Sequence, residues 1–211
     1  MRRTVSVSAC AETTDQVFDL FTSATILMVP GLRDAMPEHW QSLLEADIPG
    51  ARSVPPMEVN GLNCAARVGA LDAAVAAIEG PVILVAHSAG VLMVAHWALK
   101  HRSNVVAALL VTPPDLAAPW PEKYPRPETL RMQGWSPLPC QRLPFPSLVV
   151  ASSNDHLASP DAVRAMASAW GSELLELGAV GHMNPASGFG PWPQALELIA
   201  QLHSRAAPVV K

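Results

Sequence analysis

One serine of the chain lies between small residues at the end of an apolar run, in a pattern that suits nucleophilic catalysis. Residues 82–93 read VILVAHSAGVLM, an apolar strand pattern that changes at Ser88 into an apolar helix pattern. The segment matches the nucleophile elbow G-x-S-x-G, except that Ala86 stands at the first glycine position and keeps the small size that a tight turn needs. Such a turn places Ser88 at a helix N-terminus, where the backbone N–H of Ala89 points toward the attacked carbonyl.

A serine hydroxyl is a weak nucleophile, and it needs a base and an acid that orients the base. Asp155 follows an apolar strand expected at residues 147–151, and His182 follows a second strand expected at residues 173–177. Because both loops leave the carboxyl ends of strands, they meet at the edge of a parallel sheet where catalytic groups collect. The order Ser, Asp, His predicts Ser88 as the nucleophile, His182 as the base and Asp155 as the acid.

The acid and the oxyanion hole have alternative assignments. Asp161 and Asp115 are the other acids considered, although a helix first turn and a chain turn explain them better than a role in place of Asp155. The second N–H of an oxyanion hole comes from the loop after the first central strand, which here reads VPGLRD. The amide of Leu32 is the favoured donor, and that of Arg33 is the alternative.

Strand patterns and helix patterns alternate along the chain after residue 23. Short runs rich in Val, Ile and Leu predict strands buried on both faces, which are typical of a parallel sheet covered by helices. Strands are expected at residues 25–29, 51–54, 82–86, 105–111, 147–151 and 173–177, and helices at residues 37–46, 63–78, 89–101, 159–170 and 193–204. The alternation predicts an α/β fold with a doubly wound, mostly parallel sheet, in a single domain over residues 24–207.

The segment 112–146 differs from the rest of the chain in composition: it holds 10 of the 21 prolines and has no sustained hydrophobic periodicity. We expect it to overhang Ser88 and to shape a small apolar pocket with its aromatic side chains, of which Trp135 is a candidate pocket residue. A packed surface loop without ligand contact is the alternative. Trp40, on the helix after the first loop, is a second candidate pocket residue.

Composition excludes several classes of protein. Of the 211 residues, 50% are apolar and 15% are charged, so most of the chain must fold compactly. The net charge of −4 and the lack of a basic stripe argue against nucleic acid as a partner. The most apolar stretch, residues 82–95, is too short to span a membrane and carries His87 and Ser88 at its centre. Residues 1–23 are mostly polar and are expected to form a mobile or loosely docked N-terminal extension.

No metal or cofactor site is expected from the sequence. His96 and His101 lie five residues apart on one expected helix, which is the wrong spacing for a shared metal-binding face. The three cysteines, Cys10, Cys64 and Cys140, fit no metal or redox spacing. They are expected to be free thiols, which suits a reducing, cytoplasmic compartment.

The motifs resemble those of small single-domain serine hydrolases of the retinoblastoma-binding protein nine type, in particular the short bacterial members. The resemblance covers about residues 25–205 and is carried by the strings VPG (29–31), HWQ (39–41), LVAHSAG (84–90), PPD (113–115), SND (153–155), GHMN (181–184) and SGFGPWP (187–193). It implies an α/β-hydrolase fold with little or no inserted cap. It also implies a catalytic triad that maps onto Ser88, Asp155 and His182.

Together, the residues and the resemblance predict a hydrolase that uses neither metal nor cofactor and cleaves a small ester, thioester or amide through an acyl-enzyme. The expected partner is a small acyl-bearing molecule, and no protein partner is indicated. Two other functions stay open at this point. One is a protein-binding or regulatory module that keeps the hydrolase fold, and the other is an acyltransferase that uses the same residues.

Overall fold

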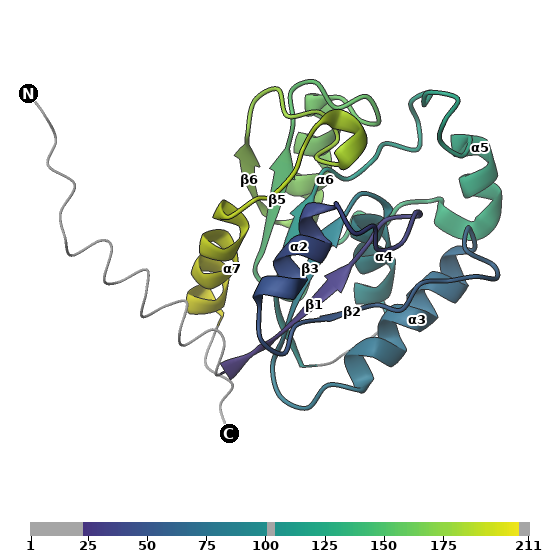
Figure 1. The fold of residues 1–211 in the computed structure, drawn as a ribbon. Helices are drawn as coiled ribbons and strands as arrows, with labels where there is room; N and C mark the ends of the chain where they lie inside the picture. Colours follow the sequence, from purple (N-terminus) through teal and green to yellow (C-terminus); the bar gives the residue numbers. More distant parts are fainter. Residues whose placement is uncertain (1–22, 101–103, 207–211) are drawn as a thin grey trace, which may run out of the picture.

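Six parallel strands form one sheet at the centre of the protein (Figure 1). The computed structural model describes residues 23–100 and 104–206, so residues 1–22 of the expected extension lie outside the described residues. The strands are β1 (Thr25–Val29), β2 (Arg52–Ser53), β3 (Val82–His87), β4 (Val105–Val111), β5 (Ser147–Ala151) and β6 (Glu173–Glu176), in the spatial order β2-β1-β3-β4-β5-β6. Every neighbouring pair is parallel. The expected α/β fold class is confirmed.

The sheet is doubly wound about the pair β1 and β3. From β1 the chain adds β2 on one side and then returns to add β3 on the other side, after which the strands continue in sequence order. The direction of winding therefore reverses next to β1. In open α/β sheets, ligands bind in the crevice outside the carboxyl ends of the strands at such a reversal. The loops that follow β1 and β3 lie at this crevice.

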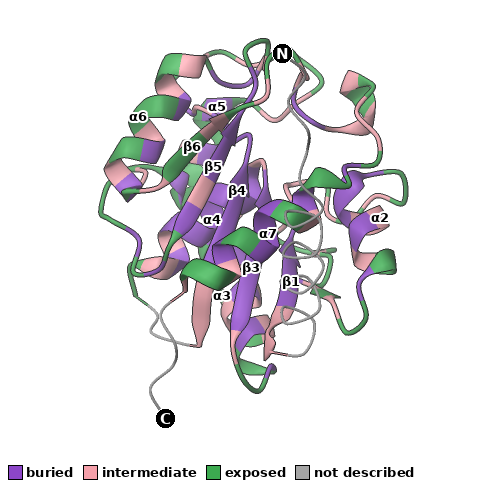
Figure 2. Cartoon of the chain, turned by 90° about the vertical axis from the view of Figure 1, so that its left-hand side faces the viewer, coloured by how far each residue is buried: buried purple, intermediate pink, exposed green. Residues whose placement is uncertain are grey.

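Helices cover both faces of the sheet. α2 (Trp40–Asp47) and α7 (Gln194–Arg205) pack on one face, and α3 (Cys64–Ala76), α4 (Ala89–Ala98) and α6 (Pro160–Trp170) pack on the other. Successive side chains of a strand point to opposite faces, so each central strand contributes to both apolar layers. Figure 2 shows the central strands buried between these helices. The apolar strands of the sequence are thus explained by burial on both sides.

The first helix begins later than the sequence pattern predicts. The helix expected from residue 37 starts at Trp40, because His39 has an extended backbone and its Nδ1 accepts the N–H of Gln41 over 3.2 Å. His39 is therefore the N-cap, and Pro37 precedes the helix. A ring nitrogen performs here what a serine or aspartate oxygen usually performs at a helix start.

The proline-rich segment is irregular apart from two short helical turns, α5 (Pro127–Leu130) and η1 (Arg131–Trp135). Two indole N–H groups fasten its backbone: Trp170 donates to the carbonyl of Pro139 over 2.8 Å, and Trp120 donates to that of Asp115, also over 2.8 Å. Its buried apolar side chains join the core layer of α3, α4 and α6. The segment is therefore held against the sheet by its own side chains.

Candidate active site

Ser88 lies at a strained turn between β3 and α4. Its backbone angles are φ 56° and ψ −129°, a region that non-glycine residues rarely adopt and that occurs at functional sites. The turn needs a glycine two residues later, because a Cβ on Gly90 would lie 2.2 Å from the carbonyl oxygen of Val29. The start of α4 thus packs directly on the end of β1. This close approach explains why the elbow motif retains its second glycine although its first is replaced by Ala86.

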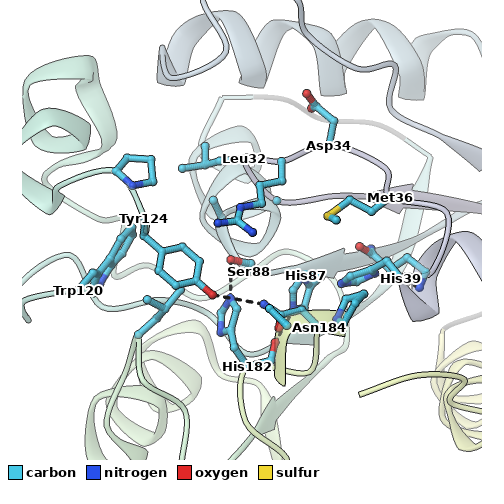
Figure 3. A pocket seen from close by; sticks show the side chains of 18 of the residues that line it. Leu32, Asp34, Met36, His39, His87, Ser88, Trp120, Tyr124, His182 and Asn184 are labelled. Carbon is cyan, nitrogen blue, oxygen red and sulfur yellow. Dashed lines mark hydrogen bonds between the residues drawn. The ribbon is translucent and has the colours of Figure 1, made fainter. Parts of the chain in front are cut away.

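The structure brings Ser88, His182 and Asp155 into one hydrogen-bonded chain (Figure 3 shows the bond between Ser88 and His182). Ser88 Oγ lies 2.8 Å from His182 Nε2, and His182 Nδ1 lies 2.8 Å from Asp155 Oδ2. The side chains of His182 and Asp155 are each only 1% exposed. Because a carboxylate can only accept, His182 Nδ1 carries the hydrogen, and Nε2 is left to accept the hydroxyl hydrogen of Ser88. The arrangement suits proton removal from Ser88.

The two alternative acids lie elsewhere. Asp161 pairs with Arg164 over 2.6 Å on the exposed side of α6, and Asp115 accepts the N–H of Ala117 over 2.8 Å in a turn. Neither is a hydrogen-bond partner of His182. Asp155 also accepts the N–H of Leu157 over 2.9 Å, which fixes the carboxylate in its loop.

A side-chain network joins the loops that carry Asp155 and His182. Asn154 Oδ1 accepts the N–H of Gly181 over 2.6 Å and the hydroxyl of Ser152 over 2.9 Å. Ser187 Oγ accepts the N–H of His182 over 3.1 Å. The bond from Gly181 to Asn154 joins the two loops, and the other two bonds brace each loop internally, so the base and the acid are positioned together. The sequence reasoning did not identify Asn154 or Ser187, although both belong to the strings SND and SGFGPWP that carry the family resemblance.

Two backbone N–H groups beside Ser88 are available for an oxyanion. Leu32 and Ala89 both line the cavity at Ser88, and within the described residues neither N–H has a hydrogen-bond acceptor. Gly31, the residue before Leu32, packs closely on Ser88: a Cβ on Gly31 would lie 3.1 Å from Ser88 Cβ. Figure 3 shows Leu32 on the side of Ser88 opposite to His182. The amide of Arg33 is one residue farther along the same loop.

Arg67 of α3 holds this loop from behind, and the sequence reasoning missed it. Its guanidinium donates to the carbonyls of Gly31 over 3.3 Å and Leu32 over 3.1 Å, and pairs with Asp34 over 2.9 Å. The Arg67 side chain is only 3% exposed. The spacing indicated its burial: Arg67 lies three residues after Cys64 and four before Leu71, and so shares the buried face of an alanine-rich helix with them.

Three imidazole rings lie in a row beside Ser88. The ring centroid of His87 lies 5.0 Å from that of His182 and 4.5 Å from that of His39. Burial lowers the pKa of His87 well below its usual value, and His182 and His39 lower it further. Burial and then His182 lower the pKa of His39 to about 4. Both rings are therefore neutral near pH 7, so they place no positive charge beside His182 when it takes up a proton.

A cavity of about 240 Å³ opens over Ser88. Its wall is largely apolar and comes from the loop after β1, from the residues just before α3, from the segment 112–146 and from the loops after β5 and β6; the apolar residues include Leu32, Met36, Leu62, Trp120, Pro125 and Leu157. Figure 3 shows Trp120 and Tyr124 together on one side of the cavity. The proline-rich segment thus contacts the site through Trp120, Tyr124 and Pro125.

The structure corrects both candidate pocket tryptophans. Trp135 is fully buried, and its indole N–H donates to the carbonyl of Leu62 over 2.7 Å, so it anchors the segment instead of lining the cavity. Trp40 is also fully buried and packs edge-on against Trp192, with ring centroids 5.1 Å apart, in the core layer of α2 and α7. Large indole rings are drawn into the core here by the apolar area that they bury.

Within the described ranges, no group of three or more His, Cys, Asp or Glu side chains is arranged to hold a metal ion. In the same part of the chain, no helix has the length and apolar character needed to cross a bilayer.

The comparison with known families agrees with this geometry. A family model described as serine hydrolase matches residues 26–201, a range that holds Ser88, Asp155 and His182. The chain belongs to this serine hydrolase family. No protein with a curated description matches the sequence of this hydrolase.

Solved structures show the same fold as this serine hydrolase. A protein described as a YdeN-like hydrolase from Pectobacterium atrosepticum is 29% identical, with a TM-score of 0.78 over 92% of this chain and 97% of that one. The ydeN gene product of B. subtilis is 17% identical, with a TM-score of 0.70 over 87% and 100% of the two chains. Est1E from Butyrivibrio proteoclasticus is 14% identical, with a TM-score of 0.57 over 85% and 84%. The latter two likenesses concern the fold alone.

Proposed function

We propose that the protein is a carboxylesterase-like serine hydrolase that cleaves a small ester, thioester or amide through an acyl-enzyme. Ser88 is the nucleophile, His182 the general base and Asp155 the acid that orients it. The observation that carries this proposal is the buried chain of hydrogen bonds from Ser88 Oγ through His182 to Asp155, beneath a cavity that also contains two unpaired N–H groups.

The geometry supports a conventional acyl-transfer sequence. His182 Nε2 takes the hydroxyl proton as Ser88 Oγ forms a bond to the substrate carbonyl carbon. The carbonyl oxygen becomes an oxyanion, which the amides of Ala89 and Leu32 stabilise at about 3 kcal/mol per donor. His182 then gives its proton to the leaving group as that bond breaks. A water molecule then gives a proton to His182 as it attacks the acyl carbon. The bond from that carbon to Ser88 Oγ breaks, His182 returns the proton to Ser88, and the carboxylic acid product leaves.

Asp155 keeps its charge throughout this sequence. It accepts the Nδ1 hydrogen of His182, fixes the tautomer and stabilises the imidazolium that forms when Nε2 is protonated. The neutral rings of His87 and His39 do not oppose this imidazolium, as a charged neighbour would.

Two finer assignments belong to the same proposal. The strings that carry the family resemblance support a member of the retinoblastoma-binding protein nine type. Among the described cysteines, Cys64 and Cys140 are free thiols, which supports a reducing, cytoplasmic compartment.

Labelling with a fluorophosphonate probe tests the nucleophile. The protein should be labelled at Ser88, Ser88→Ala should lose the label, and Ser204→Ala, which removes an exposed serine hydroxyl of α7, should keep it. A parallel panel of p-nitrophenyl esters, from acetate to decanoate, sizes the acyl pocket. Full labelling of Ser88→Ala would contradict the assignment. A folded protein without label or turnover would favour a binding module instead.

A further inference from the structure

The cavity carries a cation that the proposed mechanism does not use. Arg33 follows Leu32 in the loop after β1 and lines the cavity at Ser88. Its guanidinium carbon lies 5.2 Å from the ring centroid of Tyr124, and its Nη2 donates to the carbonyl of Lys123 over 3.1 Å. Two contacts from the proline-rich segment thus hold an otherwise exposed side chain in the wall of the cavity. A guanidinium that is already held loses less side-chain entropy when it binds an anion.

No negative charge of the cavity wall is left to balance Arg33. Asp34 also lines the cavity, but its carboxylate pairs with buried Arg67 over 2.9 Å. Asp155 lies behind His182 and does not line the cavity. Among the described residues, no carboxylate lies within ion-pair distance of Arg33. Because Arg67 balances Asp34 from behind the wall, the positive charge of Arg33 is left unbalanced at the cavity.

A second cation reinforces this charge. Lys123 Nζ lies 5.4 Å from the same ring centroid of Tyr124, and it too has no ion-pair partner within the described residues. Lys123 lines a polar groove next to the cavity, which also touches His156 and Asn154. Two unpaired cations thus share one aromatic ring beside the site, although the chain as a whole has a net charge of −4. A local charge opposite to the overall charge attracts anionic ligands to this place.

We propose that Arg33 recognises a carboxylate of the substrate, so that the enzyme cleaves esters, thioesters or amides that also bear a carboxylate. The inference rests on the proposed hydrolase function and narrows its substrate class. Arg33 is a specificity-determining residue in this view: its planar guanidinium offers paired N–H donors that match a carboxylate. The apolar wall around it accommodates the chain that links the carboxylate to the scissile carbonyl.

Two matched substrate pairs test the proposal on the full chain. The acyl-side pair is p-nitrophenyl hexanoate and the mono-p-nitrophenyl ester of adipic acid, which differ in a terminal carboxylate. The leaving-group pair is the acetyl ester of meta-hydroxybenzoate and that of meta-hydroxybenzamide. The measured quantity is the ratio of kcat/KM for the charged and the neutral member, in the wild type, Arg33→Gln, Arg33→Lys and Arg126→Gln. Arg126 is the control because it is an exposed arginine of the proline-rich segment that does not line the cavity.

In at least one pair, the wild type should favour the charged member, and Arg33→Gln should lower the ratio about tenfold or more. Arg33→Lys should retain part of the preference, and Arg126→Gln should retain it fully. Added salt should narrow the preference of the wild type. No preference in either pair, an equal loss in Arg126→Gln, or an equal loss of both members in Arg33→Gln would overturn the proposal. Fluorophosphonate labelling of Ser88 in each variant shows separately whether the hydrolase function itself holds.

Discussion

At the scale of single residues, the site depends on one tautomer of one histidine. The ring of His182 is almost completely buried between a hydroxyl and a carboxylate, with 2.8 Å to Ser88 Oγ and 2.8 Å to Asp155 Oδ2. If Asp155 did not accept from Nδ1, the hydrogen could reside on Nε2 and block proton transfer from Ser88. In the proposed mechanism, Asp155 therefore acts by orienting His182 and not by exchanging a proton of its own.

The substitution Asp155→Asn tests this dependence. An amide at this position offers a donor to Nδ1, which favours the wrong tautomer, so kcat should fall by about three to four orders of magnitude. Far-UV circular dichroism should stay unchanged. The matched control is Asp161→Asn, in which an exposed carboxylate of α6 is changed and activity should persist. A mild loss in Asp155→Asn with a severe loss in Asp161→Asn would move the role of the acid.

Arg67 is expected to affect rate and stability together. Arg67→Met removes the donors of three carbonyls, those of Gly31, Leu32 and Gly61, and leaves the carboxylate of Asp34 unpaired, so the unfolding free energy should fall by about 3 kcal/mol. The Leu32 amide then loses its fixed position, and kcat should fall about a hundredfold while KM changes less. Steady-state kinetics and urea unfolding measure both, with exposed Arg164→Met as the control. Loss of stability without loss of kcat would limit Arg67 to a structural role.

The role of some site residues can be predicted from the sequence, and that of others cannot. Ser88 and Asp155 follow apolar strands and His182 follows a short edge strand, so pattern and order suffice to bring them to one edge of the sheet. Trp40 and Trp135 show the opposite case, because a tryptophan near a site in sequence is as easily buried in the core as exposed to a ligand. Arg67 acts from a helix that approaches the loop only in the folded protein, so its role as a partner of Leu32 cannot be derived from spacing.

At the scale of elements, the N-cap of α2 makes the stability of the protein depend on pH. His39 caps the helix with Nδ1, and its pKa is lowered to about 4 by burial and by His182. The unfolded chain therefore binds a proton at a higher pH than the folded chain does. The stability due to the neutral ring is complete above about pH 6.5 and is lost as the pH falls from 6.5 toward 4.

His39→Asn should flatten this dependence, because asparagine is a good N-cap that does not titrate. The wild type should lose on the order of 3 kcal/mol from His39 between those pH values, in addition to the loss from His87, whose pKa is lowered in the same direction. Urea unfolding of both proteins at several pH values between 7.5 and 4.5 measures the difference. Parallel curves for the two proteins would show that His39 is not the titrating group.

The elements themselves are well predicted where apolar runs define them. The strands expected at residues 25–29, 105–111 and 147–151 have the bounds of β1, β4 and β5. Two-sided burial explains this agreement, because the apolar run stands out from the polar and turn residues on either side of it. The start of α2 was predicted too early because a histidine cap is not among the usual signals.

At the scale of the whole molecule, the two core layers depend on the same strands. Each central strand contributes alternate side chains to the layer of α2 and α7 and to that of α3, α4 and α6. Loss of one layer would expose a whole face of the sheet to water, so we expect both layers to unfold together. Tryptophans report on both, with Trp97 and Trp170 in one layer and Trp40 and Trp192 in the other.

Urea unfolding should therefore give coincident transitions by tryptophan fluorescence and far-UV circular dichroism. Single-tryptophan replacements with phenylalanine in each layer, Trp97→Phe and Trp192→Phe, separate the fluorescence contributions. Two resolved transitions, one for each layer, would contradict a single cooperative unit over the described residues.

The proline-rich segment contributes to the cavity wall but to none of the hydrogen bonds between Ser88, His182 and Asp155, which follow β3, β6 and β5. Part of the cavity wall and the proposed reactive groups therefore lie in different stretches of the gene. A mutant library restricted to codons 117–126 would redirect selectivity while the reactive atoms keep their places. Natural variants can diverge in the same way, changing substrate selectivity without changing the reactive groups.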